Sequence, residues 1–383
     1  MIKFLSKQIM KTFKAGNRIN QGTYKSFQPN KINQKWGIED MEVLNLLSQA
    51  DRQLGRLDMY SEYIPNIDLF ISMHVLKEAT LSSKIEGTKT NIEDALLDKE
   101  DVNDEKKDDW EEVQNYIAAL NAAIKNLEKL PFSSRLIRET HKILLQGVRG
   151  KHKLPGAFRS SQNWIGGAGI YDATFIPPIH SSINEYMGDL ENFAHNSESF
   201  FPDLLKIALI HYQFETIHPF LDGNGRVGRL MITLYLVEKG ILKKPILYLS
   251  DFFERNRILY YDNLTKVREK DDLTQWFKFF LVGVIETAKN SISTFDSILK
   301  LEKEVETKIQ ILGSRSHNAQ LILNYLYQKP IIAAKKVKEL TNLSFPSVYK
   351  LIDDLEKLEI LTETTGAKRG KIYLFRKYTE LFE

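Results

Sequence analysis

The sequence predicts an all-α protein with one small β-hairpin near its middle and a winged helix at its C-terminal end. Apolar residues recur at helical spacing over most of the chain from residue 41 onward. A stretch rich in Gly and Pro at 147–180 interrupts this pattern and contains short β-type runs. Near the C-terminus, a helix–turn–helix pattern is followed by two short β-type runs, which is typical of a winged helix.

The first third of the chain is expected to contain four helices after a polar lead-in at 1–35 that we expect to be loosely ordered. Pro65 separates the first helix from the second, and Gly87 is placed to end the second. Ser133 precedes the fourth helix and is a good N-cap residue. The charged run at 98–112 is interpreted as a solvated linker or helix face. The predicted helices are 41–57, 68–85, 110–128 and 134–146.

After the Gly- and Pro-rich stretch the helical pattern resumes and continues into a tail with a different organisation. The tail carries a turn at 342–346 between two short helical patterns. The predicted helices are 181–195, 203–217, 226–239, 252–269, 273–306, 318–328, 333–341 and 347–358, and the predicted strands are 361–364 and 371–375. We therefore expect an N-terminal helical segment over 1–110, a catalytic core over 111–290 and a winged helix over 300–383.

Composition excludes several classes of function. The formal charge is +3, from 53 basic and 50 acidic side chains, which is too balanced to indicate nucleic acid or an anionic membrane as a partner. The chain has no cysteine, so disulfides, thiolate metal sites and cysteine nucleophiles are excluded. No apolar stretch is long enough for a transmembrane helix, and the basic N-terminus does not have the pattern of a signal peptide. We expect a cytoplasmic protein.

The segment from His218 to Arg229, HPFLDGNGRVGR, is the most informative part of the sequence. Its Gly-Asn-Gly core can curl so that backbone N–H groups converge, and such a concave surface binds anionic oxygens. The apolar helix that follows adds its N-terminal N–H groups, which favour phosphate. Two arginines three residues apart share one face of its first turn and suit a polyphosphate chain. Asp222 then needs a cation such as Mg²⁺ between itself and the phosphates.

This segment resembles the signature of the Fic family, H-P-F-x-[DE]-G-N-G-R-x-x-R, without a departure. The resemblance implies a helical core that binds ATP and Mg²⁺ and transfers AMP to a Tyr, Thr or Ser hydroxyl of a protein, releasing pyrophosphate. It implies that His218 is the general base and that Asp222 is the magnesium ligand. The resemblance assigns ATP binding to Gly223, Asn224, Gly225, Arg226, Val227, Gly228 and Arg229. A related branch that acts as a kinase carries Lys at the position of Gly225, so Gly225 argues against that activity.

Three further segments are similar to the family. Ser82, Glu86 and Gly87 match the motif [ST]-x-x-x-E-[GN] of Fic proteins that inhibit themselves. Ser82 and Glu86 lie one helical turn apart, and the resemblance implies that Glu86 pairs with Arg229 and blocks the productive pose of ATP. Residues 153–180, with Trp164, Ile165 and Gly166, resemble the hairpin flap that grips the target backbone. Tyr260 and Tyr261 are candidates to flank the adenine, although a tyrosine pair at this spacing is more often part of a core.

The other histidines and the tail leave alternatives open. His211 lies two helical turns before His218 and is interpreted as a packed or hydrogen-bonded residue. In the candidate recognition helix at 347–358, acidic residues offset the lysines, while the predicted wing holds Lys368, Arg369 and Lys371. DNA, a second copy of the chain and a protein target, the chain itself included, are the candidate partners. The rival functions are a nucleotide-sensing transcription regulator and an enzyme that removes AMP at the same site.

Overall fold

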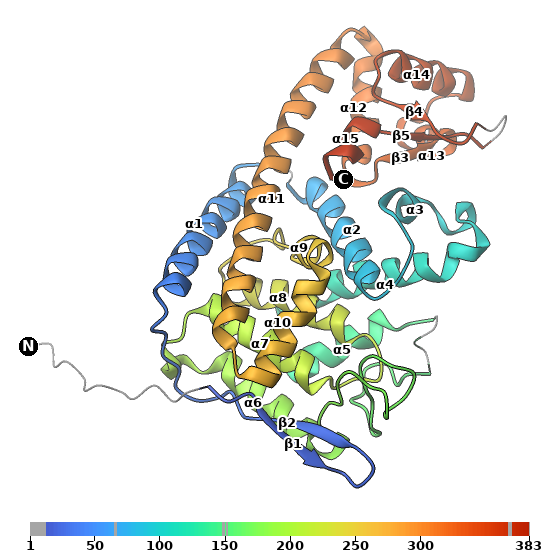
Figure 1. Ribbon diagram of the computed structural model, residues 1–383. Coiled ribbons are helices and arrows are strands. Elements are labelled where there is room, and N and C mark those ends of the chain that lie inside the picture. The colour runs from blue at the N-terminus through green and yellow to red at the C-terminus, as the bar shows by residue number, and fades with distance from the viewer. Residues whose placement is uncertain (1–12, 65–66, 148–149, 151, 367–369, 383) are drawn as a thin grey trace, which may run out of the picture.

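The structure is a computed structural model that describes residues 13–64, 67–147, 150, 152–366 and 370–382, and it is mostly helical as predicted (Figure 1). In the part of the chain it describes, no helix is long and apolar enough to cross a membrane. The first 290 residues contain these longer helices: α1 Met41–Tyr63, α2 Ile67–Ile85, α4 Lys107–Asn126, α5 Ser134–Leu144, α6 Ile183–His195, α7 Asp203–Ile217, α8 Asn224–Glu238 and α10 Arg257–Lys270. The short helices α3 Ile92–Leu96 and α9 Ser250–Arg255 lie between them.

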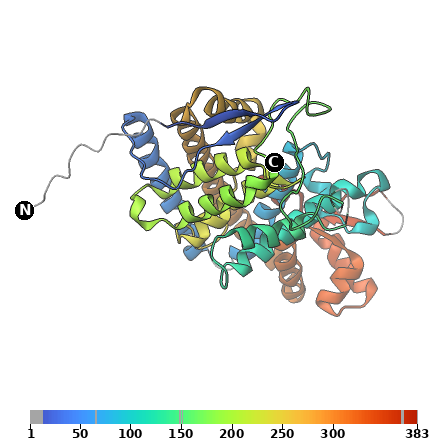
Figure 2. The same cartoon turned by 90° about the horizontal axis from the view of Figure 1, so that it is seen from below.

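The N-terminal lead-in differs from the sequence prediction, because it contains a regular β-hairpin. Strands β1 Gly16–Asn20 and β2 Lys25–Pro29 pair in antiparallel fashion. Phe27 is buried, and its N–H donates to the carbonyl of Ile176 at 2.8 Å. Figure 2 shows the hairpin lying over the helical core beside the Gly- and Pro-rich region. The polar sequence is therefore ordered by a partner about 150 residues away in the chain.

The centre of the molecule is formed by α7 and α8, which lie on either side of the segment singled out in the sequence. Every residue of α7 from Leu204 to Ile217 is buried, polar side chains such as Gln213 and Glu215 included, so the helix is enclosed on all sides. Trp276, at the start of α11 Leu273–Gln310, is fully buried and donates from Nε1 to the carbonyl of Ala208 at 2.8 Å. Packing of this density holds the two ends of the connecting loop in fixed positions.

Helix α2 is almost completely enclosed between the core and the C-terminal part of the chain. Thirteen of its residues are buried, and it packs against α4, α9 and α12 Ser316–Gln328. The rings of Phe70 and Tyr327 meet edge to face at 5.3 Å, which joins α2 to α12. The last residues of α2 reach the N-terminal end of α8, so this helix connects the C-terminal part of the chain with the loop between α7 and α8.

The region at 147–180 contains less regular structure than the predicted hairpin. Within its described residues the β pairing is a single antiparallel bridge between Ile165 and Phe175. Gly166 and Gly167 have φ values of +70° and +73°, and a Cβ atom on Gly167 would lie 2.4 Å from the carbonyl oxygen of Asp172. These two glycines permit a turn that residues with a side chain rarely adopt. The region is therefore a folded loop with one bridge, and we refer to residues 153–180 as the flap.

The C-terminal part of the chain combines three helices with a small sheet. Helices α13 Ala334–Thr341 and α14 Phe345–Lys357 follow α12, and strands β3 Ile331–Ala333, β4 Thr362–Glu363 and β5 Ile372–Leu374 form a sheet in the order β3-β5-β4. Helix α15 Arg376–Thr379 and a 3₁₀ turn at Glu380–Phe382 follow the sheet. The three helices, β4 and β5 occur in the order that the sequence predicts, whereas β3 and α15 are additional elements. The winged-helix assignment and DNA as a partner stay predictions. Lys368 and Arg369 lie outside the described residues.

Candidate active site

The segment from His218 to Asn224 forms a tight loop between α7 and α8. His218 ends α7 in the left-handed conformation, with φ +49° and ψ +61°, and Pro219 prevents the helix from continuing. Gly223, with φ +75°, is the N-cap of α8. Because no side chain caps this helix among the described residues, the first N–H groups of α8 are available to a ligand. The local geometry is the nest of donors that the sequence predicts.

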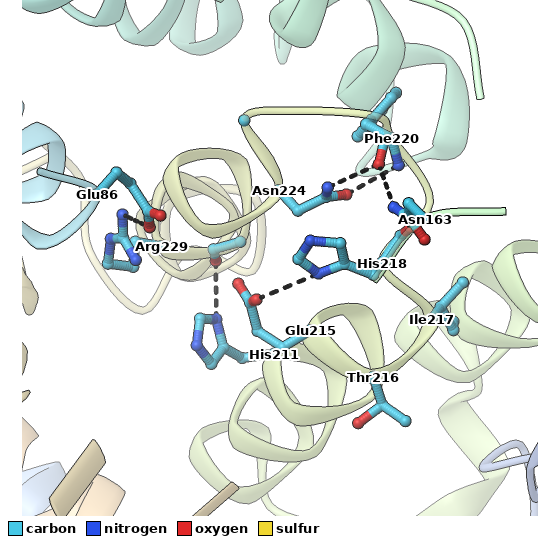
Figure 3. A network of polar contacts seen from close by, with 12 residues as sticks. Glu86, Asn163, His211, Glu215, Thr216, Ile217, His218, Phe220, Asn224 and Arg229 are labelled. Atoms are coloured by element: carbon cyan, nitrogen blue, oxygen red, sulfur yellow. Dashed lines mark hydrogen bonds and ion pairs between the residues drawn. The ribbon is translucent and has the colours of Figure 1, made fainter. Parts of the chain in front are cut away.

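The Asn224 side chain closes the loop from the inside. It is 2% exposed, its Oδ1 accepts from the N–H of Phe220 at 2.8 Å, and its Nδ2 donates to the carbonyl of Phe220 at 2.8 Å. The Asn163 side chain donates to the same carbonyl at 2.9 Å. Asn224 therefore holds the bend by hydrogen bonds, and its side chain is not free to bind nucleotide. Figure 3 shows this cluster beside the ring of His218.

His141 from α5 supports the outer side of the loop. Its ring stacks on Phe220 with centroids 3.7 Å apart and planes 8° apart. Its Nδ1 accepts from the N–H of Gly156, and its Nε2 lies 3.0 Å from the carbonyl of Asp222, so the proton of the neutral ring is on Nε2. Burial lowers the pKa of His141 to about 4. No sequence motif indicates this residue, because its hydrogen-bond partners are backbone atoms from other parts of the chain.

His218 is held from both sides of its peptide and points its ring toward α7. The buried Arg159 donates from Nε to the carbonyl of His218 at 3.0 Å. The ring atom Nδ1 lies 4.0 Å from Oε2 of Glu215 (Figure 3). Burial, followed by the charges of Arg268 and Arg159, lowers the pKa of His218 to about 3. The imidazole is therefore neutral at neutral pH, so one of its ring nitrogens carries a lone pair.

Arg226 and Asp222 lie close together at the entrance of the loop. Arg226 is 4% exposed, and its guanidinium contacts Oε2 of Glu112 at 3.1 Å and Oδ1 of Asp222 at 3.3 Å. The side chain of Asp222 is 40% exposed. The side chain of Val227 is buried in the core, and Gly228 packs against Glu215, so these two residues can contribute only backbone atoms to a ligand.

Arg229 makes the ion pair that the sequence predicts. Its Nη2 lies 2.7 Å from Oε1 of Glu86, its Nε donates to Oγ of Ser82 at 2.9 Å, and its Nη2 also donates to the carbonyl of Ser82 at 2.8 Å. Burial alone would lower the pKa of Arg229, but the charge of Glu86 raises it above the usual value. A Cβ atom on Gly225 would lie 2.2 Å from Oε1 of Glu86, so this position accepts only glycine while the pair is closed.

The remaining predicted residues lie around this centre. Gly87 follows α2 with φ +107°, directly after Glu86. Tyr260 is 1% exposed, bonds through its hydroxyl to Nε2 of His211 at 2.8 Å and is stacked on Phe253, which is at odds with a place beside the adenine. Tyr261 is 40% exposed, so of these two tyrosines it is the one that a ligand can reach. His211 is a packed, hydrogen-bonded histidine, as expected, with its Nδ1 2.9 Å from the carbonyl of Gly228.

The arrangement has clear counterparts among known proteins. The model of the Fic/DOC family N-terminal domain matches residues 44–125, and the model of the Fic/DOC family domain matches residues 131–236. The chain belongs to the Fic/DOC family. The Fic domain match contains the loop from His218 to Arg229, and the N-terminal match contains Ser82 and Glu86.

Relatives of this Fic protein include named enzymes. A probable protein adenylyltransferase of Aquifex aeolicus is 30% identical over 148 residues, which are 37% of this chain and 43% of that protein. The protein adenylyltransferase Fic of Aedes aegypti is 28% identical over 167 residues, which are 41% of this chain and 30% of the mosquito protein. The match therefore spans less than half the length of these curated relatives.

A solved structure supports the fold over most of the chain. The crystal structure of a Fic family protein from Desulfovibrio desulfuricans G20 superposes with a TM-score of 0.56 at 20% sequence identity. The superposition covers 89% of this chain and 98% of that chain. The match confirms the helical Fic fold.

Proposed function

We propose that this Fic protein transfers AMP from ATP to a hydroxyl side chain of a protein and that Glu86 inhibits the transfer. The observation that carries the proposal is the uncapped N-terminus of α8, which lies between the neutral imidazole of His218 and the guanidinium of Arg229. A helix N-terminus with an arginine in its first turns attracts phosphate oxygens. The names of the relatives, protein adenylyltransferases, support the same reaction.

The loop has the donors that a triphosphate needs. The first N–H groups of α8 point out of the helix end and would bind the α- and β-phosphates. Arg226 is already fixed by Glu112 and would contact the same phosphates from the side. Arg229 would hold the γ-phosphate once Glu86 has left it, because a guanidinium binds phosphate with two parallel hydrogen bonds.

A magnesium ion fits the residues at the mouth of the loop. Asp222 is partly exposed and accepts hydrogen bonds at Oδ1 from Gly223 and Arg226. One carboxylate together with phosphate oxygens and water is the usual magnesium environment in sites of this kind, and the described residues contain no larger cluster of acidic and histidine ligands. Asp222 would hold the ion, which would supply charge neutralisation for the phosphates.

His218 would act as the general base. The proton of the target hydroxyl moves to the imidazole while the hydroxyl oxygen attacks the α-phosphorus. The bond from the α-phosphorus to the β-bridging oxygen breaks, and pyrophosphate leaves with the bonding electrons. Arg159, Asn224 and His141 fix the backbone on both sides of the imidazole, so the base is already in place when the substrates bind.

The Glu86–Arg229 pair supports inhibition in the observed state. The two groups are 2.7 Å apart, and Arg229 is further bound to Ser82. An arginine engaged in this way cannot bind the γ-phosphate. A hydrogen bond between charged groups contributes about 1.5–3 kcal/mol, so opening the pair should favour productive ATP binding by about 10- to 100-fold.

The test is transfer of labelled AMP from ATP to protein by the wild type, Glu86→Gly and His218→Ala. We expect Glu86→Gly to exceed the wild type about 10- to 100-fold and His218→Ala in the Glu86→Gly background to lose at least 10²-fold. Mass spectrometry of the Glu86→Gly protein incubated with ATP should detect added AMP if the chain modifies itself. Binding of ATP without any transfer would contradict the proposal and favour a nucleotide sensor, and release of AMP from a modified protein would favour the reverse reaction.

A further inference from the structure

Glu215 is a buried carboxyl group that the reaction described above does not use. It lies on α7 three residues before His218, and the two side chains lie next to each other at the end of this helix (Figure 3). Glu215 is 7% exposed, and its Oε2 lies 4.0 Å from Nδ1 of His218. Carboxyl groups are rarely buried to this degree unless they have a partner.

One carboxyl oxygen of Glu215, Oε1, and the ring nitrogen of His218 nearest to this side chain, Nδ1, are buried and lack a hydrogen-bond partner among the described residues, while the other carboxyl oxygen, Oε2, is the one that lies closest to the ring. A buried donor or acceptor left in this state costs about 1–3 kcal/mol, so such atoms call for a functional explanation. The gap of 4.0 Å is only about 1 Å longer than a hydrogen bond.

The wall behind the carboxyl group is shaped to accommodate it. Gly228 on α8 faces Glu215, and a Cβ atom at this position would lie 2.3 Å from Oε1 of Glu215. Any other residue at 228 would push the carboxyl group out of place. The carboxyl group thus lies between Gly228 of α8 and the imidazole of His218 (Figure 3).

The charges around the pair show why His218 needs an acidic neighbour. Burial, Arg268 and Arg159 lower the pKa of His218, while the backbone carbonyl of Glu215 and then the charge of Asp222 raise it. Without a further contribution the imidazole would be a weak base, because an imidazolium there would stand near two guanidinium groups. Glu215 itself has its pKa raised to about 7 by burial, with Arg229 lowering it, Glu86 raising it and Arg268 lowering it.

We propose that Glu215 is a positioning residue that accepts a hydrogen bond from Nδ1–H of His218 during AMP transfer. This inference rests on the proposed function. The contact fixes the tautomer in which the lone pair of Nε2 faces the substrate. As the target oxygen bonds to the α-phosphorus and the bond to pyrophosphate breaks, the hydroxyl proton moves to Nε2. The imidazolium formed in this step is stabilised by the Glu215 carboxylate.

The first test compares Glu215→Gln and Glu215→Asp in the active Glu86→Gly background. Glu215→Gln keeps the size of the side chain but removes its charge, so we expect kcat to fall about 10²-fold while KM for ATP changes less than about 3-fold. Glu215→Asp keeps the charge and should recover part of kcat. The matched control is Glu128→Gln, at an exposed position just beyond α4, which should leave kcat unchanged. Equal kcat for Glu215→Gln and the control would overturn the proposal.

The second test measures the tautomer and the pKa of His218 by NMR and does not depend on transfer activity. In protein labelled with ¹⁵N-histidine, the His218 signal is identified by its loss in His218→Ala. We expect the Nδ1–H tautomer in the Glu86→Gly protein and a lower pKa of His218, by at least about one unit, in Glu215→Gln. An unchanged tautomer and pKa in folded Glu215→Gln and Glu215→Asp would overturn the pairing. A changed pKa without AMP transfer by any variant would support the pairing and contradict the proposed function instead.

Discussion

The loop at 218–229 and the flap at 153–180 lie next to each other but are built in opposite ways. In the loop, Phe220, Asn224 and Arg229 are at most 3% exposed. The side chain of Asn224 is hydrogen-bonded to Phe220, and that of Arg229 is hydrogen-bonded to Ser82. In the flap, Trp164 is 41% exposed and Tyr171 is 82% exposed, and the regular pairing is one bridge. Fixed donors suit a ligand that never changes, whereas an adaptable surface suits protein targets of varied shape.

Arg159 joins the two regions. It is 2% exposed, and within the described part of the chain its guanidinium donates to the backbone carbonyls of His218 and Ile217 on the loop side and of Ser161 and Pro178 in the flap. Its own N–H donates to the carbonyl of Pro219. The rigid loop therefore anchors both ends of the flap.

The largest effect on AMP transfer is expected from a substitution of Arg159, which removes the connection between the loop and the flap. Arg159→Met leaves several buried carbonyls without a donor and separates the flap from the loop, so kcat/KM for AMP transfer should fall about 10³-fold. The exposed residue Arg135 on α5 provides the control Arg135→Met, which should be close to the parent. A loss smaller than 3-fold would show that the two regions do not depend on each other.

The next largest effect is expected inside the loop. Asn224→Ala removes two hydrogen bonds to Phe220, so binding of ATP, measured by calorimetry, should weaken about 10²-fold. Asn121→Ala, at an exposed position on α4, is the matched control. Unchanged ATP affinity in a folded Asn224→Ala protein would mean that the loop does not require the hydrogen bonds between Asn224 and Phe220 in order to bind ATP.

A smaller effect is expected from the flap, and it should affect the protein target alone. Trp164→Ala removes an exposed aromatic that is available to a partner, so AMP incorporation into protein should fall about 10-fold. The affinity for ATP should remain that of the parent, because Trp164 belongs to the flap and not to the loop at 218–229. A parallel loss of ATP affinity would contradict the division of labour between the two regions.

The smallest effect concerns His141, which touches both regions. Its pKa is about 4 in the folded protein and about 6.5 in the unfolded chain, so below pH 6.5 the unfolded chain binds the proton first and stability decreases as the pH falls. Between pH 7.5 and pH 6 this histidine should cost about 0.8 kcal/mol of unfolding free energy. Urea unfolding of the wild type and of His141→Gln measures the difference, which cancels the contributions of the other buried histidines. Identical pH dependence of both proteins would rule out this linkage.

The sequence predicts the centre of the site better than its surroundings. The Glu86–Arg229 ion pair that the family resemblance implies is present in the structure, and the loop lies between two helices as its motif predicts. The roles of His141 and Arg159 were missed, since their partners are backbone carbonyls far away in the chain. The sequence does not predict the hairpin β1–β2, because its polar strands are ordered by contact with the flap. Of the two tyrosines considered as neighbours of the adenine, Tyr260 is instead buried and hydrogen-bonded to His211.

Helix α11 has a further consequence for the whole molecule. Its 38 residues form one rod of about 57 Å that begins in the Fic core at Trp276 and ends where the C-terminal part begins. Each added residue would turn everything beyond it by about 100°. Phe382 then could not meet His74, nor Tyr327 meet Phe70, so the helix length sets the angular phase at which the two halves of the protein fit together.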